Sequence, residues 1–196
     1  MPIPIVNIAK MAGAAVSNRL VGRRVPLNLM LALTDRCTGR CRYCQLPARR
    51  SPEMSTDEIR RLLDEAAAAG CQRVGLWGGE PLIRDDVGDI IRHARKAGLF
   101  VTVDTNGHLI PEHGEALKAA SHANISLDGD EAAHDANRGP GSWARTMAGI
   151  EIARTLGVPF WTITVLSKHN IGDIDWILDT ARRLGFLATF QVLHHN

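Results

Sequence analysis

Residues 70–81 read "GCQRVGLWGGEP", and this short stretch contains the unit from which most of the chain is built. Gly70 closes a helix-like stretch, because glycine adopts the left-handed conformation that ends a helix at no steric cost. The run "CQRVGLW" after it has the apolar and β-branched character of a strand. "GGEP" then ends that strand with residues typical of a loop. A helix stop, a strand and a polar strand end are the elements of an alternating α/β fold.

The same unit recurs along the chain. Gly98, Gly157 and Gly185 each close a helix-like stretch, and the runs "LFVTVDT", "VPFWTITV" and "FLATFQV" follow them. The runs "VPLNLMLALT" at 25–34 and "ANISLD" at 123–128 complete a set of six expected strands with five intervening helices. Alternating strands and helices predict a parallel sheet, either doubly wound or closed towards a barrel.

The unusual residues of the sequence all follow expected strands. In both architectures, chemistry is carried out at the carboxyl ends of the strands. The six strand ends carry, in chain order, Cys37 with Cys41 and Cys44, then "GGEP", "TNG", "SLDG", "TVLSKHN" and "LHHN". We therefore expect one rim of the sheet to hold the functional site.

Three of the four cysteines lie at C-x3-C-x2-C spacing in the first of these loops. Thiolates at Cys37, Cys41 and Cys44 can bind three corners of a cubane iron–sulfur cluster, which leaves the fourth iron open to another ligand. The alternative is a zinc site completed by one of the eight histidines, although none lies near this loop in sequence. Cys71 opens the second strand and is expected to be a buried, small apolar residue.

The cysteine spacing with Tyr43 before the last cysteine, together with Gly78-Gly79-Glu80-Pro81 at the next strand end, resembles the radical S-adenosylmethionine (radical SAM) superfamily. The resemblance runs from about residue 26 to the end of the chain. It implies a partial (β/α)6 TIM-like barrel and a [4Fe-4S] cluster on the three cysteines, with SAM chelating the fourth iron. It also implies reductive cleavage of SAM to a 5′-deoxyadenosyl radical, which abstracts a hydrogen atom from the substrate.

The resemblance further implies which residues contact SAM. These are Tyr43, Gly78, Gly79 and Glu80 (with the last three on the methionine amine), Asn106, Ser126 and Asp128 at the ribose, Arg138 at the carboxylate, and Leu166 with Ser167 at the adenine. Several of these residues have a plainer alternative, which is a strand-ending turn for "GGEP", Asn106 and Asp128, and a solvated loop arginine for Arg138. His134 and Asp135 are expected to brace that loop. At most one of His194 and His195 points inward, because neighbouring strand residues alternate.

The segment "SLDGDEAAHDANRGPGSW" resembles a branch of the superfamily that includes peptide-modifying (SPASM) and molybdenum-cofactor enzymes. Relatives of this kind continue into a cysteine-rich extension with auxiliary clusters. No cysteine follows Cys71 here, so we expect no auxiliary cluster within these residues. The chain stops at the sixth expected strand without a helix to cover it, which indicates a fragment of a longer protein.

Composition and charge indicate the class of partner and the role of the N-terminal segment. The net charge is +2, so nucleic acid is not expected as a partner. Residues 1–25 are basic and predict an amphipathic helix that packs on the core domain (26–196), with a transit peptide or peripheral membrane contact as alternatives. We expect a cytoplasmic enzyme with a peptide or small-molecule substrate and an electron donor such as flavodoxin or ferredoxin. A zinc-binding interaction module and a non-catalytic SAM-binding barrel are the competing functions.

Overall fold

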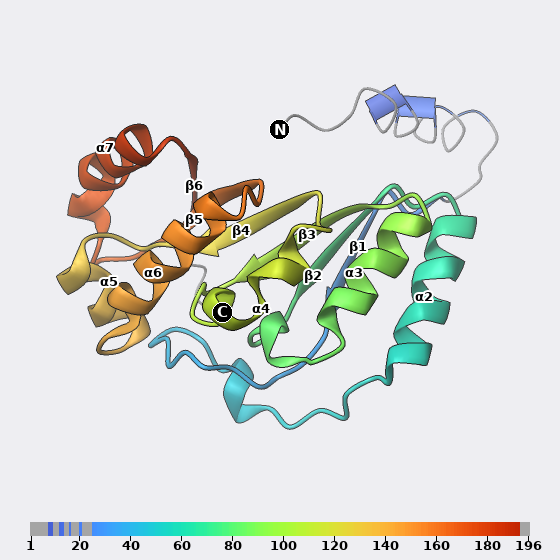
Figure 1. The fold of residues 1–196 in the computed structure, drawn as a ribbon, viewed down its shortest axis with the longest axis horizontal. Coiled ribbons are helices and arrows are strands. Elements are labelled where there is room, and N and C mark those ends of the chain that lie inside the picture. The colour runs from blue at the N-terminus through green and yellow to red at the C-terminus, as the bar shows by residue number, and fades with distance from the viewer. Residues whose placement is uncertain (1–7, 10–11, 14–15, 17–19, 21–24, 193–196) are drawn as a thin grey trace.

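The computed structural model describes residues 8–9, 12–13, 16, 20 and 25–192. Six parallel strands form one sheet, and their order in the sheet is their order in the chain (Figure 1). The strands are β1 (Asn28–Ala32), β2 (Arg73–Trp77), β3 (Phe100–Thr105), β4 (His122–Ser126), β5 (Phe160–Leu166) and β6 (Leu187–Val192). A doubly wound sheet reverses its strand order, whereas a barrel adds strands in one direction. The sheet stays open among the described residues, which confirms the expected partial (β/α)6 TIM-like barrel.

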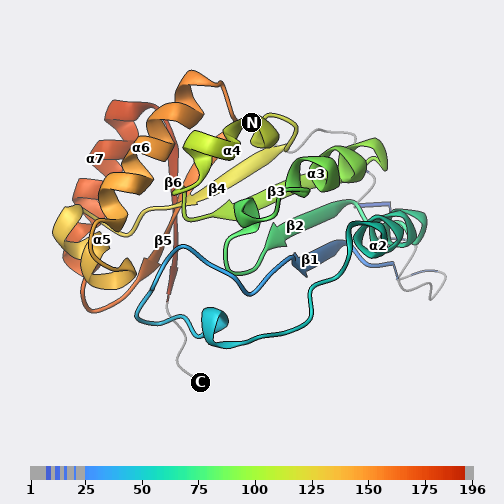
Figure 2. The ribbon, with the colours of Figure 1, turned by 60° about the horizontal axis from the view of Figure 1, so that its bottom comes forward.

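Helices cover one side of this sheet, as the turned view shows (Figure 2). They are α2 (Thr56–Ala68), α3 (Val87–Lys96), α4 (Ile110–Leu117), α5 (Glu131–Arg138), α6 (Ser142–Thr155) and α7 (Ile174–Leu184), with short 3-10 turns η1 (Leu46–Ala48), η2 (Pro81–Ile83) and η3 (Ile171–Asp173). The core lies between the two layers, where Val74, Val103 and Ile125 of the strands belong to the same buried cluster as Ile90 and Ile150 of the helices. Alternate strand residues therefore face the helices, and the others face the concave side.

The predicted helix stops are confirmed. Gly70, Gly98, Gly157 and Gly185 follow α2, α3, α6 and α7, with φ angles of 98°, 85°, 69° and 75°. A residue with a β-carbon is strained in this left-handed region, so glycine fixes where each helix ends and the next strand begins. Because each of these helices ends at a glycine just before the next strand, the carboxyl ends of the strands lie on one rim of the sheet.

The connection between β4 and β5 differs from the expectation of one helix, because it contains both α5 and α6. The Asp130 carboxylate accepts a hydrogen bond from the backbone N–H of Ala133 at the start of α5. Gly139, with φ 102°, follows its last residue. Arg138 therefore ends a helix rather than lying in a loop. This helix has only eight residues, and its apolar residues are three alanines, so the sequence offers no run of large apolar side chains that would reveal it.

Two expectations concern residues outside the described part of the chain. Most of the expected helix at 1–25 lies there, as do His194 and His195. Among the helices that the structure describes, none combines the length and the apolarity needed to cross a membrane.

Candidate functional site

The three cysteines of the first loop lie together after β1 as free, half-buried thiols. A β-carbon placed on Gly39 would lie 3.6 Å from the Sγ of Cys37 and 3.7 Å from the Sγ of Cys41, so these two sulfurs border the same small space. Burial raises the pKa of Cys37 and of Cys41, and the neighbouring thiols, Cys44 among them, raise it further. Because neighbouring negative charge opposes the ionisation of Cys37 and of Cys41, a cation bound beside them would stabilise their thiolate forms.

Two of these sulfurs accept hydrogen bonds from the surrounding protein. The Sγ of Cys37 accepts from the backbone N–H of Gly39 at 3.3 Å and from Nδ2 of Asn106 at 3.6 Å. The Sγ of Cys41 accepts from Nη1 of Arg138 at 3.9 Å. Donors of this kind favour the thiolate, which is the form that ligates metals.

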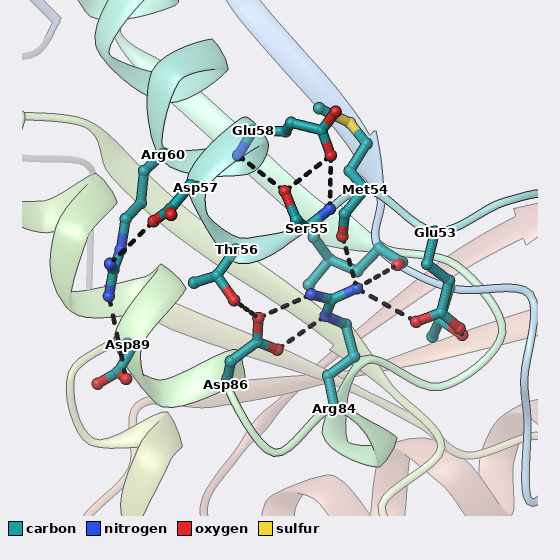
Figure 3. A network of polar contacts seen from close by, with 12 residues as sticks. Glu53, Met54, Ser55, Thr56, Asp57, Glu58, Arg60, Arg84, Asp86 and Asp89 are labelled. Carbon is teal, nitrogen blue, oxygen red and sulfur yellow. Dashed lines mark hydrogen bonds and ion pairs between the residues drawn. The ribbon is translucent and has the colours of Figure 1, made fainter.

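The chain that returns from the cysteines to α2 is fixed by one buried guanidinium, that of Arg84 (Figure 3). Its Nη1 donates to the carbonyl oxygens of Leu33 and Met54 and to the carboxylate of Glu53, at 3.1–3.3 Å. Its Nε and Nη2 donate to Asp86 at 2.8 and 2.7 Å. The buried charge is both paired and hydrogen-bonded, and its contacts tie the chain before and after the cysteine loop to the end of β2.

The two glycines of "GGEP" allow the end of β2 to lie against the chain that leads to the cysteines. The backbone N–H of Gly79 donates to the carbonyl of Thr34 at 2.7 Å, and that of Glu80 donates to Arg36 at 2.8 Å. A β-carbon on Gly78 or Gly79 would collide with these same carbonyl groups. Gly78 also has a φ angle of 135°, a conformation that other residues rarely adopt. The glycine pair is therefore required by close backbone packing.

Glu80 is fully buried, and protein donors use both of its carboxylate oxygens. It accepts hydrogen bonds from the backbone N–H of Leu82 at 3.1 Å, from the hydroxyl of Thr105 at 2.8 Å and from the backbone N–H of Asn106 at 2.8 Å. Burial raises its pKa to about 7, and these hydrogen bonds oppose that rise. The carboxylate ties the end of β2 to the end of β3, so the backbone carbonyls are what this segment has left for a ligand.

Asp128 and Arg138 form a buried ion pair behind the cysteine loop. The fully buried Asp128 carboxylate accepts from Nε and Nη2 of Arg138 at 2.7 and 3.2 Å, from the hydroxyl of Tyr43 at 3.2 Å and from the backbone N–H of Val165 at 2.9 Å. Although burial alone would lower the pKa of Arg138, the adjacent Asp128 raises it, so the guanidinium stays charged. Asp128 is thus the counter-ion of Arg138, with four donors on its two oxygens, rather than a free acceptor for ribose hydroxyls.

A hollow of about 470 Å³ opens beside the cysteine loop at the end of β5. Tyr43 and Asn137 line one part of it, and Leu166 with Ser167 line another. Ser126 lies at the end of the neighbouring strand β4, opposite Ile163, and its hydroxyl makes no hydrogen bond to any described residue. Of the residues expected at a SAM site, Tyr43, Leu166 and Ser167 line this hollow, and Ser126 has an unused hydroxyl.

A second polar network, centred on two buried histidines, lies under the cysteine loop. His134 Nδ1 accepts from the backbone N–H of Asp128 at 3.1 Å, and its Nε2 lies 3.2 Å from the Ser142 hydroxyl. His108 Nε2 lies 3.0 Å from the same hydroxyl, and its Nδ1 lies 3.3 Å from the Thr38 hydroxyl. The expected bracing role of His134 is confirmed, and that of Asp135 is too, since it accepts from the backbone N–H groups of Gly141 and Trp143.

These histidines predict a pH dependence of stability. Burial, together with the nearby arginine charges, lowers the pKa of His108 and of His134 to about 4. In the unfolded chain a histidine titrates near 6.5, so below that pH the unfolded state binds more protons than the folded state. We expect the urea midpoint to fall as the pH is lowered from about 7 to about 5, and His134→Gln to weaken that dependence. The exposed His169→Gln is the control, and an equal slope in both variants would contradict the prediction.

The family model of the radical SAM superfamily matches residues 31–181, which is most of the chain and includes the whole site. The protein belongs to the radical SAM superfamily.

Relatives of this radical SAM chain include enzymes of two kinds. It is 41% identical over 164 residues to an AdoMet-dependent heme synthase of Methanosarcina barkeri, a match that covers 80% of this chain and 47% of the relative. It is 33% identical over 168 residues to a PqqA peptide cyclase of Ruegeria pomeroyi, covering 82% of this chain and 45% of the relative. The chain therefore spans about half the length of these relatives.

Solved structures support the radical SAM fold. SuiB of Streptococcus suis bound to S-adenosylmethionine superposes with a TM-score of 0.80 at 18% identity. The superposition covers 94% of this chain and 45% of SuiB. At this identity the likeness concerns the fold, and it agrees with the open six-stranded sheet described above.

The cofactors of the superfamily, a [4Fe-4S] cluster and SAM, fit the donor set. A cubane binds each thiolate at a separate iron, so its three ligands need not converge on one point. Among the residues that the structure describes, no three His, Cys, Asp or Glu side chains are placed to hold a single metal ion. Cys71 is only 3% exposed and packs in the core, as expected.

Four residues that support the site were not predicted from the sequence. They are His108, Thr38 and Ser142 in the network under the cysteine loop, and Arg84 beside it. His108 lies two residues after Asn106, in the same strand-end loop, and this proximity was its one sequence signal. Arg84 carried no motif, because its role depends on Glu53 and Leu33, far away in the chain.

Proposed function

We propose that the protein is a radical SAM enzyme in which Cys37, Cys41 and Cys44 each bind one iron of the cluster. The observation that carries the proposal is the group of three free thiols at the strand-end rim, with N–H donors on two of the sulfurs. When bound, the cluster supplies an electron that breaks a carbon–sulfur bond of SAM, and the 5′-deoxyadenosyl radical takes a hydrogen atom from the substrate. The protein binds both, orients them and keeps water out.

We propose that different residues around the cysteines bind different parts of SAM. Nη1 of Arg138 faces the cysteine loop while its other two nitrogens hold Asp128, so Nη1 is the atom that we propose for the SAM carboxylate. The backbone carbonyls of Gly78 and Gly79 receive the methionine amine. The unused hydroxyl of Ser126 suits the ribose, and the hollow beside Tyr43 and Leu166 suits the adenine.

The electron donor that we propose is an acidic flavodoxin or ferredoxin that docks on the cysteine loop. Residues 36–52 contain five arginines and no acidic residue, although the net charge of the whole chain is only +2. Arg40, Arg42, Arg49 and Arg50 are exposed on this segment. A concentrated positive face steers an acidic partner to the place where an electron has to enter. All four cysteines are free thiols, which agrees with a reducing, cytoplasmic location.

The substrate that we propose for the whole protein is a small molecule, with a peptide as the second candidate. The heme synthase relative shares 41% identity and the peptide cyclase 33%, which favours the small-molecule kind. A peptide remains the second candidate substrate because SuiB, whose structure has been solved with its precursor peptide SuiA, shares the fold. Transfer of deuterium from a labelled candidate into 5′-deoxyadenosine distinguishes the two, because only the true substrate donates the atom.

Metal analysis of anaerobically reconstituted protein tests the proposal. We expect about four irons and four sulfides per chain and negligible zinc, with the broad visible absorbance of a [4Fe-4S] cluster. Addition of SAM should change the electron paramagnetic resonance (EPR) spectrum of the reduced cluster, because SAM binds its open iron. Stoichiometric zinc without sulfide would instead support a zinc-binding module and would contradict the proposal.

A further inference from the structure

The polar network under the cysteine loop has one end at a cysteine sulfur, and the residue at that end is Asn106. Its Nδ2 lies 3.6 Å from the Sγ of Cys37 and 3.1 Å from the hydroxyl oxygen of Thr38. Its Oδ1 accepts a hydrogen bond from the backbone N–H of His108 at 2.9 Å. The side-chain amide is therefore used at both ends, and the backbone donor at Oδ1 decides which end is the NH2 group.

The network continues from Thr38 through His108. The hydroxyl of Thr38 lies 3.3 Å from Nδ1 of His108, and Nε2 of His108 lies 3.0 Å from the hydroxyl of Ser142. His108 is buried, and burial lowers its pKa to about 4, so the ring is neutral at neutral pH. A neutral network therefore holds Asn106 without adding charge next to the sulfurs.

We propose that Asn106 is a positioning residue for the cluster: its N–H donates to the Cys37 thiolate and raises the reduction potential of the cluster. Reduction adds negative charge to the cluster and its thiolates, and the positive end of an N–H dipole stabilises the more negative state. This inference rests on the proposed function, because it takes Cys37 as a cluster ligand. The sequence motif predicts a contact between Asn106 and SAM, whereas this proposal assigns its side chain to the cluster ligand Cys37.

Burial strengthens the influence of the Asn106 N–H group on the reduction potential of the cluster. Asn106 is 8% exposed and His108 is 7% exposed, so water does not readily replace the lost donor when the amide is removed. The backbone of Asn106 is held separately, through its N–H on Glu80 and its carbonyl on the Thr146 hydroxyl. Truncation of the side chain therefore leaves the main chain tied in place and removes the sulfur contact.

The test is the midpoint potential of the cluster, measured by EPR-monitored redox titration of the reconstituted protein without SAM. In Asn106→Ala we expect the equilibrium constant for reduction to fall about tenfold, which is about 59 mV towards lower potential for a one-electron couple. Asn106→Asp, which replaces the donor with a charged oxygen, should shift the potential further in the same direction. Asn124→Ala is the matched control: its amide donates to Asp104 on the neighbouring strand, so its potential should equal that of the wild type.

Each outcome separates this inference from the proposed function. Wild-type protein that assembles no cluster contradicts the proposed function itself. Wild-type protein that assembles a cluster, with Asn106→Ala and Asn124→Ala both at the wild-type potential, contradicts only the role of Asn106. Loss of the cluster from both Asn106 variants while their circular dichroism stays native also contradicts it, because the amide would then be required for assembly rather than for tuning.

Discussion

Replacement of Cys41 with alanine will abolish the iron–sulfur absorbance and all cleavage of SAM. Alanine offers no ligand, and the two thiolates that remain cannot hold the cluster at three corners. Cys37→Ala and Cys44→Ala should behave in the same way, because each thiolate binds a different iron. The measurements are iron and sulfide per chain after anaerobic reconstitution, and 5′-deoxyadenosine formed with dithionite as reductant.

Cys71→Ala is the control for these variants. Cys71 is buried in the core, and its thiol donates only to the backbone carbonyl of Arg73 at 3.2 Å. Its replacement should leave the cluster intact and lower the free energy of unfolding by about 1–3 kcal/mol. A full cluster in Cys41→Ala, or a lost cluster in a folded Cys71→Ala protein, would show that the ligands are assigned wrongly.

Replacement of Arg138 will weaken SAM binding about tenfold or more. Charge-assisted hydrogen bonds contribute about 1.5–3 kcal/mol, and each 1.4 kcal/mol is a factor of ten in affinity. Arg138→Ala alone is a poor probe, because it leaves the fully buried Asp128 carboxylate unpaired, at a cost of about 3–5 kcal/mol in stability. Arg138→Lys keeps a positive charge without the planar fork, so it should recover only part of the affinity.

The double variant Asp128→Asn/Arg138→Gln resolves this difficulty. It removes both charges together, so no unpaired buried charge remains. We expect it to fold and to keep the cluster, because the cysteines are unchanged, while its affinity for SAM falls about tenfold by calorimetry. If the cluster-loaded double variant and Arg138→Lys both bind SAM as tightly as the wild type, Arg138 does not hold the carboxylate.

The fold was predictable because its determinants are local. Gly70 and Gly98 end helices through their own backbone conformation, and the apolar runs after them fall within single strands. The strand-end rule then places the cysteines and "GGEP" on one rim without any knowledge of side-chain contacts. The helix α5 was missed because it is only eight residues long and contains no apolar residue larger than alanine, and this error put Arg138 in a loop.

The partners of individual side chains were not predictable in the same way. The motifs singled out Glu80 and Asp128 as candidate site residues, but a pattern does not say which donors a carboxylate meets after folding. Glu80 meets Thr105, 25 residues away, and Asp128 meets Tyr43, 85 residues away. His108 and Ser142 lie 34 residues apart. These contacts depend on the register of neighbouring strands, which hydrophobic periodicity does not specify.

The central claim is that this chain cleaves SAM reductively, and the most direct test is the amount of 5′-deoxyadenosine formed. Cluster-loaded protein, SAM and dithionite are incubated without oxygen, and the product is measured by liquid chromatography. We predict that 5′-deoxyadenosine accumulates with the wild type and is absent with Cys41→Ala. Wild-type protein whose cluster is reduced and whose SAM is bound, but which forms no 5′-deoxyadenosine, would contradict the claim and leave a non-catalytic SAM-binding barrel.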